Sequence, residues 1–175
     1  ATHFSIGSSS KVGATIADDI KNSSYKSAVI ALICIFLYIL VRFRKWQFGI
    51  GAIVALLHDA LFVISSFAIA NLLGISFEVD QVFVAAILTI IGYSINDTVV
   101  VFDRIRENLG IKSGSEIYQV FNDSLSNTIS RTFITSLTTL IVVIILFLFG
   151  GEVLKGFSFA LLVGIIIGTY SSLFI

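Results

Sequence analysis

Five long apolar segments, joined by shorter polar ones, dominate the pattern of hydrophobic and polar positions along the chain. A transmembrane α-helix needs about 20 consecutive, mostly apolar residues to cross the hydrocarbon core of a bilayer. We therefore predict an all-α integral membrane protein with five transmembrane helices. The predicted spans are residues 24–41, 48–73, 81–102, 132–151 and 156–175.

Two other segments carry a weaker helical pattern. Within the lead-in, residues 1–23, Val12, Ile16 and Ile20 recur every four positions. That spacing favours an amphipathic helix that continues into the first span, and a solvated lead-in is the alternative. Residues 114–130 place four apolar side chains on one helical face, which predicts a short interfacial helix along the membrane; a short packed connector is the alternative. The four are Ile117, Phe121, Leu125 and Ile129.

The composition supports a membrane protein and narrows its partners. Hydrophobic residues make up 57% of the chain and the mean hydropathy is +1.02, which exceeds what a soluble domain contains. The formal net charge is zero, so we expect a lipid bilayer and no nucleic acid as a partner. The chain contains no Met, and we therefore expect it to be an internal piece of a longer protein.

Residue types that carry enzymatic or metal chemistry are sparse and scattered. The two histidines, His3 and His58, lie far apart, and the one cysteine, Cys34, lies in an apolar run where packing is its expected role. The sequence shows no zinc-ligand spacing, phosphate-binding loop or nucleophile elbow. It therefore predicts no enzyme, no metal and no bound cofactor.

The basic residues predict the orientation in the membrane. The loops at 42–47 and 103–131 hold seven of the eleven Lys and Arg residues, whereas the loop at 74–80 holds none. Basic loops are retained in the cytoplasm. We therefore predict that the two basic loops are cytoplasmic and that the lead-in, residues 1–23, is extracytoplasmic.

Asp97 is the one charged residue in the predicted span 81–102. An ionised carboxylate that faces lipid costs a few kcal/mol or more, so an acid at this depth is a functional-site candidate. Asn96 and Thr98 flank it and make the polarity local. At 1.5 Å per residue, Asp97 lies about 24 Å along its helix from Gln81, in the cytoplasmic third of the bilayer.

Arg131 begins the next predicted span at a comparable depth. The two helices are consecutive and antiparallel, so we expect Arg131 to come within reach of Asp97, directly or through water. Thr135 and Thr138 share the helical face of Arg131 and add hydroxyl groups that could hold water or pass protons.

Two interpretations of this pair stay open. A static ion pair that holds two helices together is one, although desolvation offsets most of what a buried ion pair contributes. A reversible proton-binding site is the other, and we favour it for Asp97. Asp59 is equally costly in the middle of the second span, and the adjacent His58 offers it a local partner, so a functional and a structural role are equally open for Asp59.

The stretch that contains Asp97 also carries a family resemblance. Its sequence is Gly92-Tyr-Ser-Ile-Asn-Asp-Thr-Val-Val-Val-Phe-Asp-Arg-Ile-Arg-Glu107. This closely resembles the signature of the SecF family of bacterial Sec protein-export membrane subunits, which also occur fused to SecD as SecDF. Further matching stretches cover nearly all of the chain in the family's order. They are Val12-Gly13, Leu57-His58-Asp59, Ser130-Arg131-Thr132, Thr135-Ser-Leu-Thr-Thr139, Phe149-Gly-Gly151 and Gly168-Thr-Tyr-Ser-Ser172.

The resemblance implies a fold of the RND transporter superfamily, in which this chain would supply five helices of a six-helix half. It implies that the protein uses the proton-motive force to promote late steps of protein export, after the ATP-driven SecA step. Asp97 matches the family's intramembrane proton-relay aspartate and Arg131 its essential arginine. The implied partners are SecD, the SecYEG channel, the translocating preprotein, YajC and YidC, in the bacterial cytoplasmic membrane.

Two other functional classes stay open. One is an RND-like proton-coupled exporter of lipids or small molecules, which would share the relay but carry another cargo. The other is a non-transporting scaffold of a membrane complex, which would function without a titrating Asp97.

Overall fold

The computed structural model describes residues 14–111 and 116–175, and all regular structure in these ranges is α-helical. Five helices follow one another as α1 (Ala14–Phe43), α2 (Trp46–Leu72), α3 (Gln81–Ile111), α4 (Ile117–Phe149) and α5 (Glu152–Phe174). Each is long and apolar enough to cross a membrane. The predicted all-α fold with five spanning helices is confirmed.

Several helices extend beyond the predicted spans. Helix α1 begins at Ala14, so the part of the lead-in from residue 14 onward is helical, while residues 1–13 lie outside the described residues. Helix α3 continues past residue 102 to Ile111. Apolar runs mark where a helix lies in lipid, but intrahelical hydrogen bonds continue equally well in water. Hydropathy therefore underestimated the length of these helices.

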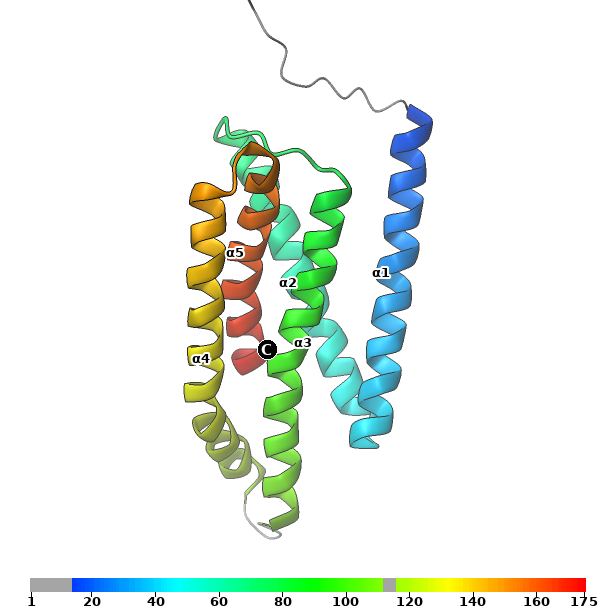
Figure 1. Cartoon of the computed structure of the whole chain (residues 1–175). Helices are drawn as coiled ribbons and strands as arrows, with labels where there is room; N and C mark the ends of the chain where they lie inside the picture. Colours follow the sequence, from blue (N-terminus) through cyan, green and yellow to red (C-terminus); the bar gives the residue numbers. More distant parts are fainter. Residues whose placement is uncertain (1–13, 112–115) are drawn as a thin grey trace, which may run out of the picture.

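The predicted interfacial helix over 114–130 is not a separate element. Within the described residues it is the first half of α4, which runs unbroken from Ile117 to Phe149. Ser124 and Thr128 donate hydrogen bonds to backbone carbonyls of the preceding turn, an arrangement that often bends helices. Figure 1 shows this lower part of α4 at an angle to the rest.

The packed face of this half is not its apolar stripe. The buried side chains are Val120, Ser124 and Thr128, whereas Ile117 and Phe121 are exposed. Lipid is as apolar as Leu, so burying apolar surface gives no driving force between membrane helices, and small or polar residues make the contacts. The apolar stripe is more exposed than this packed face, and its Phe121 lines a groove with residues of α2, α3 and α5.

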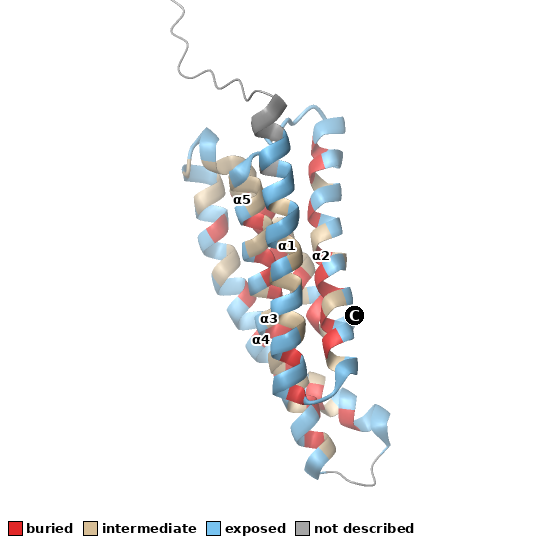
Figure 2. Ribbon diagram, turned by 90° about the vertical axis from the view of Figure 1, so that its right-hand side faces the viewer, coloured by how far each residue is buried: buried red, intermediate tan, exposed pale blue. Residues whose placement is uncertain are grey.

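Four helices enclose an apolar core toward the end of the bundle that holds the 73–80 loop. Helix α5 packs against α2, α3 and α4, and the core joins Val63 and Phe67 of α2, Ala86 and Ile90 of α3, and Leu161 of α5. Helix α1 stands at the side and contacts α2 and α3 through Ile39 and Phe43. Most of its surface is exposed (Figure 2).

Two glycines set the closest approach between α3 and α5. A Cβ atom on Gly164 would lie 2.5 Å from the side chain of Ile90, and one on Gly168 would lie 3.2 Å from Cβ of Ser94. Small residues at such positions let membrane helices pack backbone to backbone. These glycines bring the buried polar side chains of α3, Ser94 among them, close to α5.

Candidate functional site

Asp97 faces the interior of the bundle, on the side of the apolar core nearer the 112–115 loop. Only 4% of its surface is exposed. Its Oδ2 atom is buried and has no hydrogen-bond partner among the described groups. A buried polar atom without a partner costs about 1–3 kcal/mol, more when it is charged. The structure therefore keeps a carboxyl oxygen at an energetic cost, which is typical of functional positions.

Two polar groups of α4 act on this carboxylate, namely the charge of Arg131 and the hydroxyl group of Ser136. Arg131 is exposed and forms no direct ion pair with Asp97 in the described part of the chain. Arg131 therefore interacts with Asp97 here through its charge, and direct or water-mediated contact in another state stays a prediction. A change in the angle between α3 and α4 would change this interaction directly.

Ser136 connects Asp97 to a small group of hydroxyls. Its Oγ lies 2.6 Å from Oγ1 of Thr169 on α5 and accepts a longer hydrogen bond, 3.4 Å, from the hydroxyl of Tyr93 on α3. A hydroxyl group can both donate and accept. Such a chain can reverse its hydrogen bonds when the protonation of a neighbour changes.

The buried face of α4 is a ladder of hydroxyls spaced four residues apart. Its members are Ser124, Thr128, Thr132 and Ser136. Oγ1 of Thr132 is buried and, like Oδ2 of Asp97, lacks a partner among the described groups. This ladder runs along the buried side of α4 from Ser124 to Ser136.

Asp59 belongs to a second buried group one helix away. It is fully buried, and its Oδ2 accepts a hydrogen bond of 2.6 Å from Oγ of Ser94 on α3. Its Oδ1 lies 3.2 Å from Nδ1 of His58. A Cβ on Gly168 would lie 3.5 Å from Oδ2, so α5 closes the third side of the carboxylate. The expectation that His58 partners Asp59 is met, and Ser94 is an additional partner.

The other predicted accessory residues do not gather around Asp97. Asn96 is exposed and lines a groove between α3 and α1. Thr135 is exposed, and its hydroxyl bonds to backbone carbonyls of Arg131 and Thr132 in its own helix. Thr98 is buried and donates to the carbonyl of Ser94, which places it on the Asp59 side.

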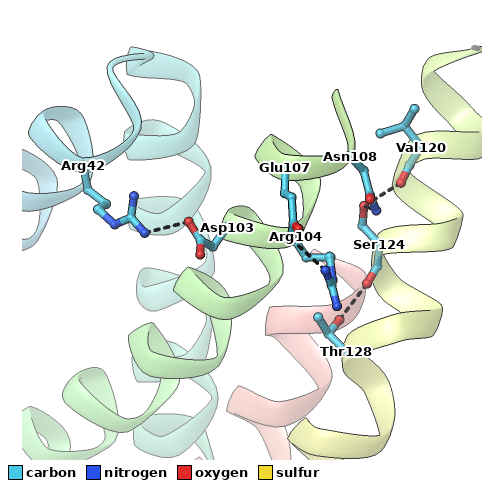
Figure 3. Close-up of polar contacts among 8 residues, drawn as sticks. All are labelled: Arg42, Asp103, Arg104, Glu107, Asn108, Val120, Ser124 and Thr128. Atoms are coloured by element: carbon cyan, nitrogen blue, oxygen red, sulfur yellow. Dashed lines mark hydrogen bonds and ion pairs between the residues drawn. The ribbon is translucent and has the colours of Figure 1, made fainter. Parts of the chain in front are cut away.

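A cavity of about 330 Å³ opens between α1, α3 and α4, and is lined in part by Val100, Thr128 and Arg131. Along the chain, the lining residues Val100 and Thr128 lie about one helical turn from Asp97 and Thr132. Ion pairs of 2.7 Å join Arg42 to Asp103 and Arg104 to Glu107 in its wall (Figure 3).

Sequence reasoning missed Ser94, Thr169 and the lower ladder residues Ser124 and Thr128. A signal was available for the ladder, because hydroxyl residues recur every four positions from 124 to 136. In a membrane helix that stripe predicts the packed face. Ser94 and Thr169 are isolated in the sequence, and their roles come from which helices meet. Among the described residues there is no group of three His, Cys, Asp or Glu side chains that could hold a metal.

The comparison with known families gives one match over the whole chain. Residues 1–175 match the model described as protein export membrane protein SecD/SecF, C-terminal. The chain is 56% identical over 165 residues to a protein translocase subunit SecF of Rhodothermus marinus, covering 94% of this chain and 53% of that protein. It is 48% identical over 167 residues to SecF of Desulfurispirillum indicum, covering 94% and 51%. The chain thus spans about half the length of the relatives it matches.

Two solved structures share this fold. A SecDF of Thermus thermophilus, described as a translocon-associated membrane protein, aligns with a TM-score of 0.81 at 42% identity, over 92% of this chain and 22% of that chain. A SecDF in a super-membrane-facing form aligns with a TM-score of 0.78 at 40% identity, over 93% and 21%. With five helices long enough to span a bilayer, these matches indicate a multi-pass bacterial membrane protein. The chain belongs to the SecD/SecF family of protein export membrane proteins, whose C-terminal region it matches.

Proposed function

We propose that this chain is the membrane part of an accessory subunit of the Sec translocase, which uses the proton-motive force to promote late steps of protein export. Membership of the SecD/SecF family supports the export role. The chain covers about half of its relatives' length, so the activity and the partners of the whole protein are part of this proposal. The role we propose is a coupling role without an enzymatic step.

The observation that carries the proposal is the carboxyl group of Asp97. It lies at bilayer depth, 4% exposed, with one oxygen unpartnered and the charge of Arg131 nearby. A side chain used only for packing would be apolar or fully hydrogen-bonded. A carboxyl oxygen without a hydrogen-bond donor is open to a proton, and Oδ2 of Asp97 is such an oxygen.

The surrounding residues suggest how the proton moves. The cavity beside Arg131 provides access from the side of the 112–115 loop, and the hydroxyls of Thr132 and Ser136 line the remaining distance along α4. A guanidinium near a carboxylate favours its ionised form. If α3 and α4 shift, the distance between Arg131 and Asp97 changes and the proton is bound or released. One proton that crosses the membrane provides about 2.3 kcal/mol per 100 mV, enough to shift a two-state equilibrium more than tenfold.

The proposed setting is the bacterial cytoplasmic membrane, with residues 1–23 on the outer side. The proposed partners are SecD or the SecD half of one chain, the SecYEG channel, the translocating preprotein, YajC and YidC. The basic residues of the 42–47 loop and of α3 support this orientation. Movement of α3 would be transmitted to parts of the protein outside the membrane.

Asp97→Asn tests the proposal, because the amide keeps the shape of the side chain but does not titrate. In the full-length protein, the variant should insert normally and lose the gradient-dependent stimulation of late translocation into membrane vesicles. The measurement compares translocation with and without a proton gradient, at matched protein levels. Asp19→Asn, an exposed acid on α1, is the control and should respond as the unmodified protein does. An Asp97→Asn protein with the full gradient response would exclude the relay and favour a scaffold.

A further inference from the structure

The buried pair of His58 and Asp59 has features that packing alone does not require. Asp59 occupies the middle of α2 and is fully buried, while the side chain of His58 is 26% exposed. Oδ1 of Asp59 lies 3.2 Å from Nδ1 of His58. The pair therefore links the centre of the bundle to its surface through two titratable groups in direct contact.

The contact geometry accommodates more than one protonation state. An ionised Asp59 accepts a hydrogen bond from Nδ1–H of a His58 imidazolium, and a protonated Asp59 donates one to the unprotonated Nδ1 of a neutral His58. Both arrangements hold one proton between the two groups and carry no net charge. Loss of that proton to water breaks the N–H or O–H bond and leaves a net charge of −1 in the bundle.

Few other ionisable groups face this pair. Helix α3 contributes Ser94 as the direct partner. Tyr93 immediately precedes Ser94 on this helix, and Asp97 follows it by three residues. Helix α5 carries Tyr170 as its single titratable residue beyond Lys155, and that side chain is exposed. In the spanning part of α1, between Lys26 and Arg42, the titratable residues are Cys34 and Tyr38, both exposed.

The pair is also tied to the helix that carries Asp97. Ser94 donates its 2.6 Å hydrogen bond to Oδ2 of Asp59 and lies three residues before Asp97 on α3. Hydrogen bonds to an ionised acceptor are about twice as strong as neutral ones. A change in the charge of Asp59 therefore changes how firmly α3 is held against α2. Gly168 leaves room for this contact, since a Cβ there would press on Ser94.

We propose that His58 and Asp59 form a second proton-binding site, which exchanges one proton in each cycle and controls the position of α3 through Ser94. This inference rests on the proposed function, because the cycle it serves is the one driven through Asp97. His58, the less buried of the two side chains, is the group that takes up and gives up the proton. Asp59 holds the charge, and Ser94 passes the change to α3.

A proton count tests the site itself. The full-length protein in lipid nanodiscs is titrated between about pH 5 and pH 8, where histidine-containing pairs exchange protons. The double variant His58→Gln, Asp59→Asn should bind one proton fewer than the unmodified protein over this interval. Equal titration curves would mean a static pair and would overturn the proposal. The count does not require an active translocase.

Gradient-dependent export tests the role of the site. Asn at position 59 can still accept a hydrogen bond from Ser94 and donate one to His58, so Asp59→Asn should fold. Its gradient-dependent stimulation should be at least tenfold smaller and should vary less with pH. Ser94→Ala should weaken the stimulation while keeping the pH profile, because the pair still titrates. Ser66→Ala, whose hydroxyl bonds only the carbonyl of Val63 in its own helix, is the matched control and should change neither.

The outcomes separate the two proposals. An Asp59→Asn protein with the normal gradient response and pH profile overturns this inference and leaves the role of Asp97 standing. Loss of the response in Asp59→Asn but not in Asp97→Asn overturns the proposed relay and leaves the His58–Asp59 site. A Ser94→Ala protein identical to the unmodified one excludes coupling through Ser94.

Discussion

The contact between Gly164 and Ile90 gives a prediction whose size can be worked from the structure. Ile90 is 1% exposed, and a Cβ on Gly164 would lie 2.5 Å from both Cγ1 and Cδ1 of Ile90 and 2.7 Å from Cγ2. The ordinary separation of such carbons is about 3.5–4.0 Å. Ile is β-branched and has one strongly preferred rotamer in a helix. Ile90 cannot turn away, so in Gly164→Ala the helices α3 and α5 must separate.

Two effects of opposite sign set the magnitude. Overpacking of a well-packed interior costs about 1–3 kcal/mol. Replacing Gly by Ala inside a helix contributes up to about 1 kcal/mol of helix propensity. We therefore expect Gly164→Ala to lower the free energy of unfolding by about 1–2 kcal/mol. Gly110→Ala is the control, because nothing lies within 4 Å of its Cβ position, and it should be neutral or slightly stabilising.

The assay is reversible unfolding of the full-length protein in mixed micelles, followed by circular dichroism as the denaturing detergent fraction rises. Ile90→Ala removes all three clashing atoms and should be destabilising alone. Combined with Gly164→Ala it should cost less than the sum of the two, since the new methyl group enters the space that Ile90 leaves. The double-mutant cycle should give a coupling energy of about 0.5–3 kcal/mol. A Gly164→Ala protein as stable as Gly110→Ala, or an additive cycle, would refute the reasoning.

Three further predictions concern topology, a turn and an ion pair. In a Cys34→Ala background, an impermeant thiol reagent should label Glu78→Cys but not Lys45→Cys in intact cells; the reverse pattern would invert the proposed orientation. Gly151 begins α5 at φ 78° and ψ 174°, a conformation open essentially to glycine alone, so Gly151→Ala should cost about 1–3 kcal/mol in the same unfolding assay, and an unchanged stability would contradict the strain. Asp103→Asn removes an ion pair whose side chains are 42% and 52% exposed, so it should cost less than about 1 kcal/mol, and a larger loss would show that the pair is shielded from solvent.

Spanning helices could be predicted because lipid leaves the backbone no hydrogen-bond partner except itself. Their ends could not, because Ala14 and Ile111 lie where a helix passes into water and hydropathy carries no information about it. Nor could the continuity of α4, because the polar residues before Arg131 give no sign that the helix runs unbroken from Ile117 to Phe149.

For the site, the interior position of Asp97 followed from the cost of a charge in lipid. The rotation of each helix about its axis did not follow from the sequence. It places Asn96 on the exposed face of α3, although Asn96 adjoins Asp97, and it brings Ser94 against Asp59, 35 residues away. Those contacts depend on how closely α5 approaches α3 at Gly168, which is a property of the assembled bundle.

Helices α3 and α4 both continue well past Asp97 and Ser136, and the parts that project are joined to each other. The amide of Asn108 donates a buried hydrogen bond of 2.8 Å to Oγ of Ser124. This bond couples the projecting end of α3 to that of α4. Asn108 lies eleven residues past Asp97, about 16 Å along the helix axis, and a small tilt at the carboxylate becomes a larger displacement at the tip. Thermodynamic coupling is reciprocal. A protein that binds these projecting helix ends and favours one tilt of α3 would therefore change the proton affinity of Asp97 from outside the membrane.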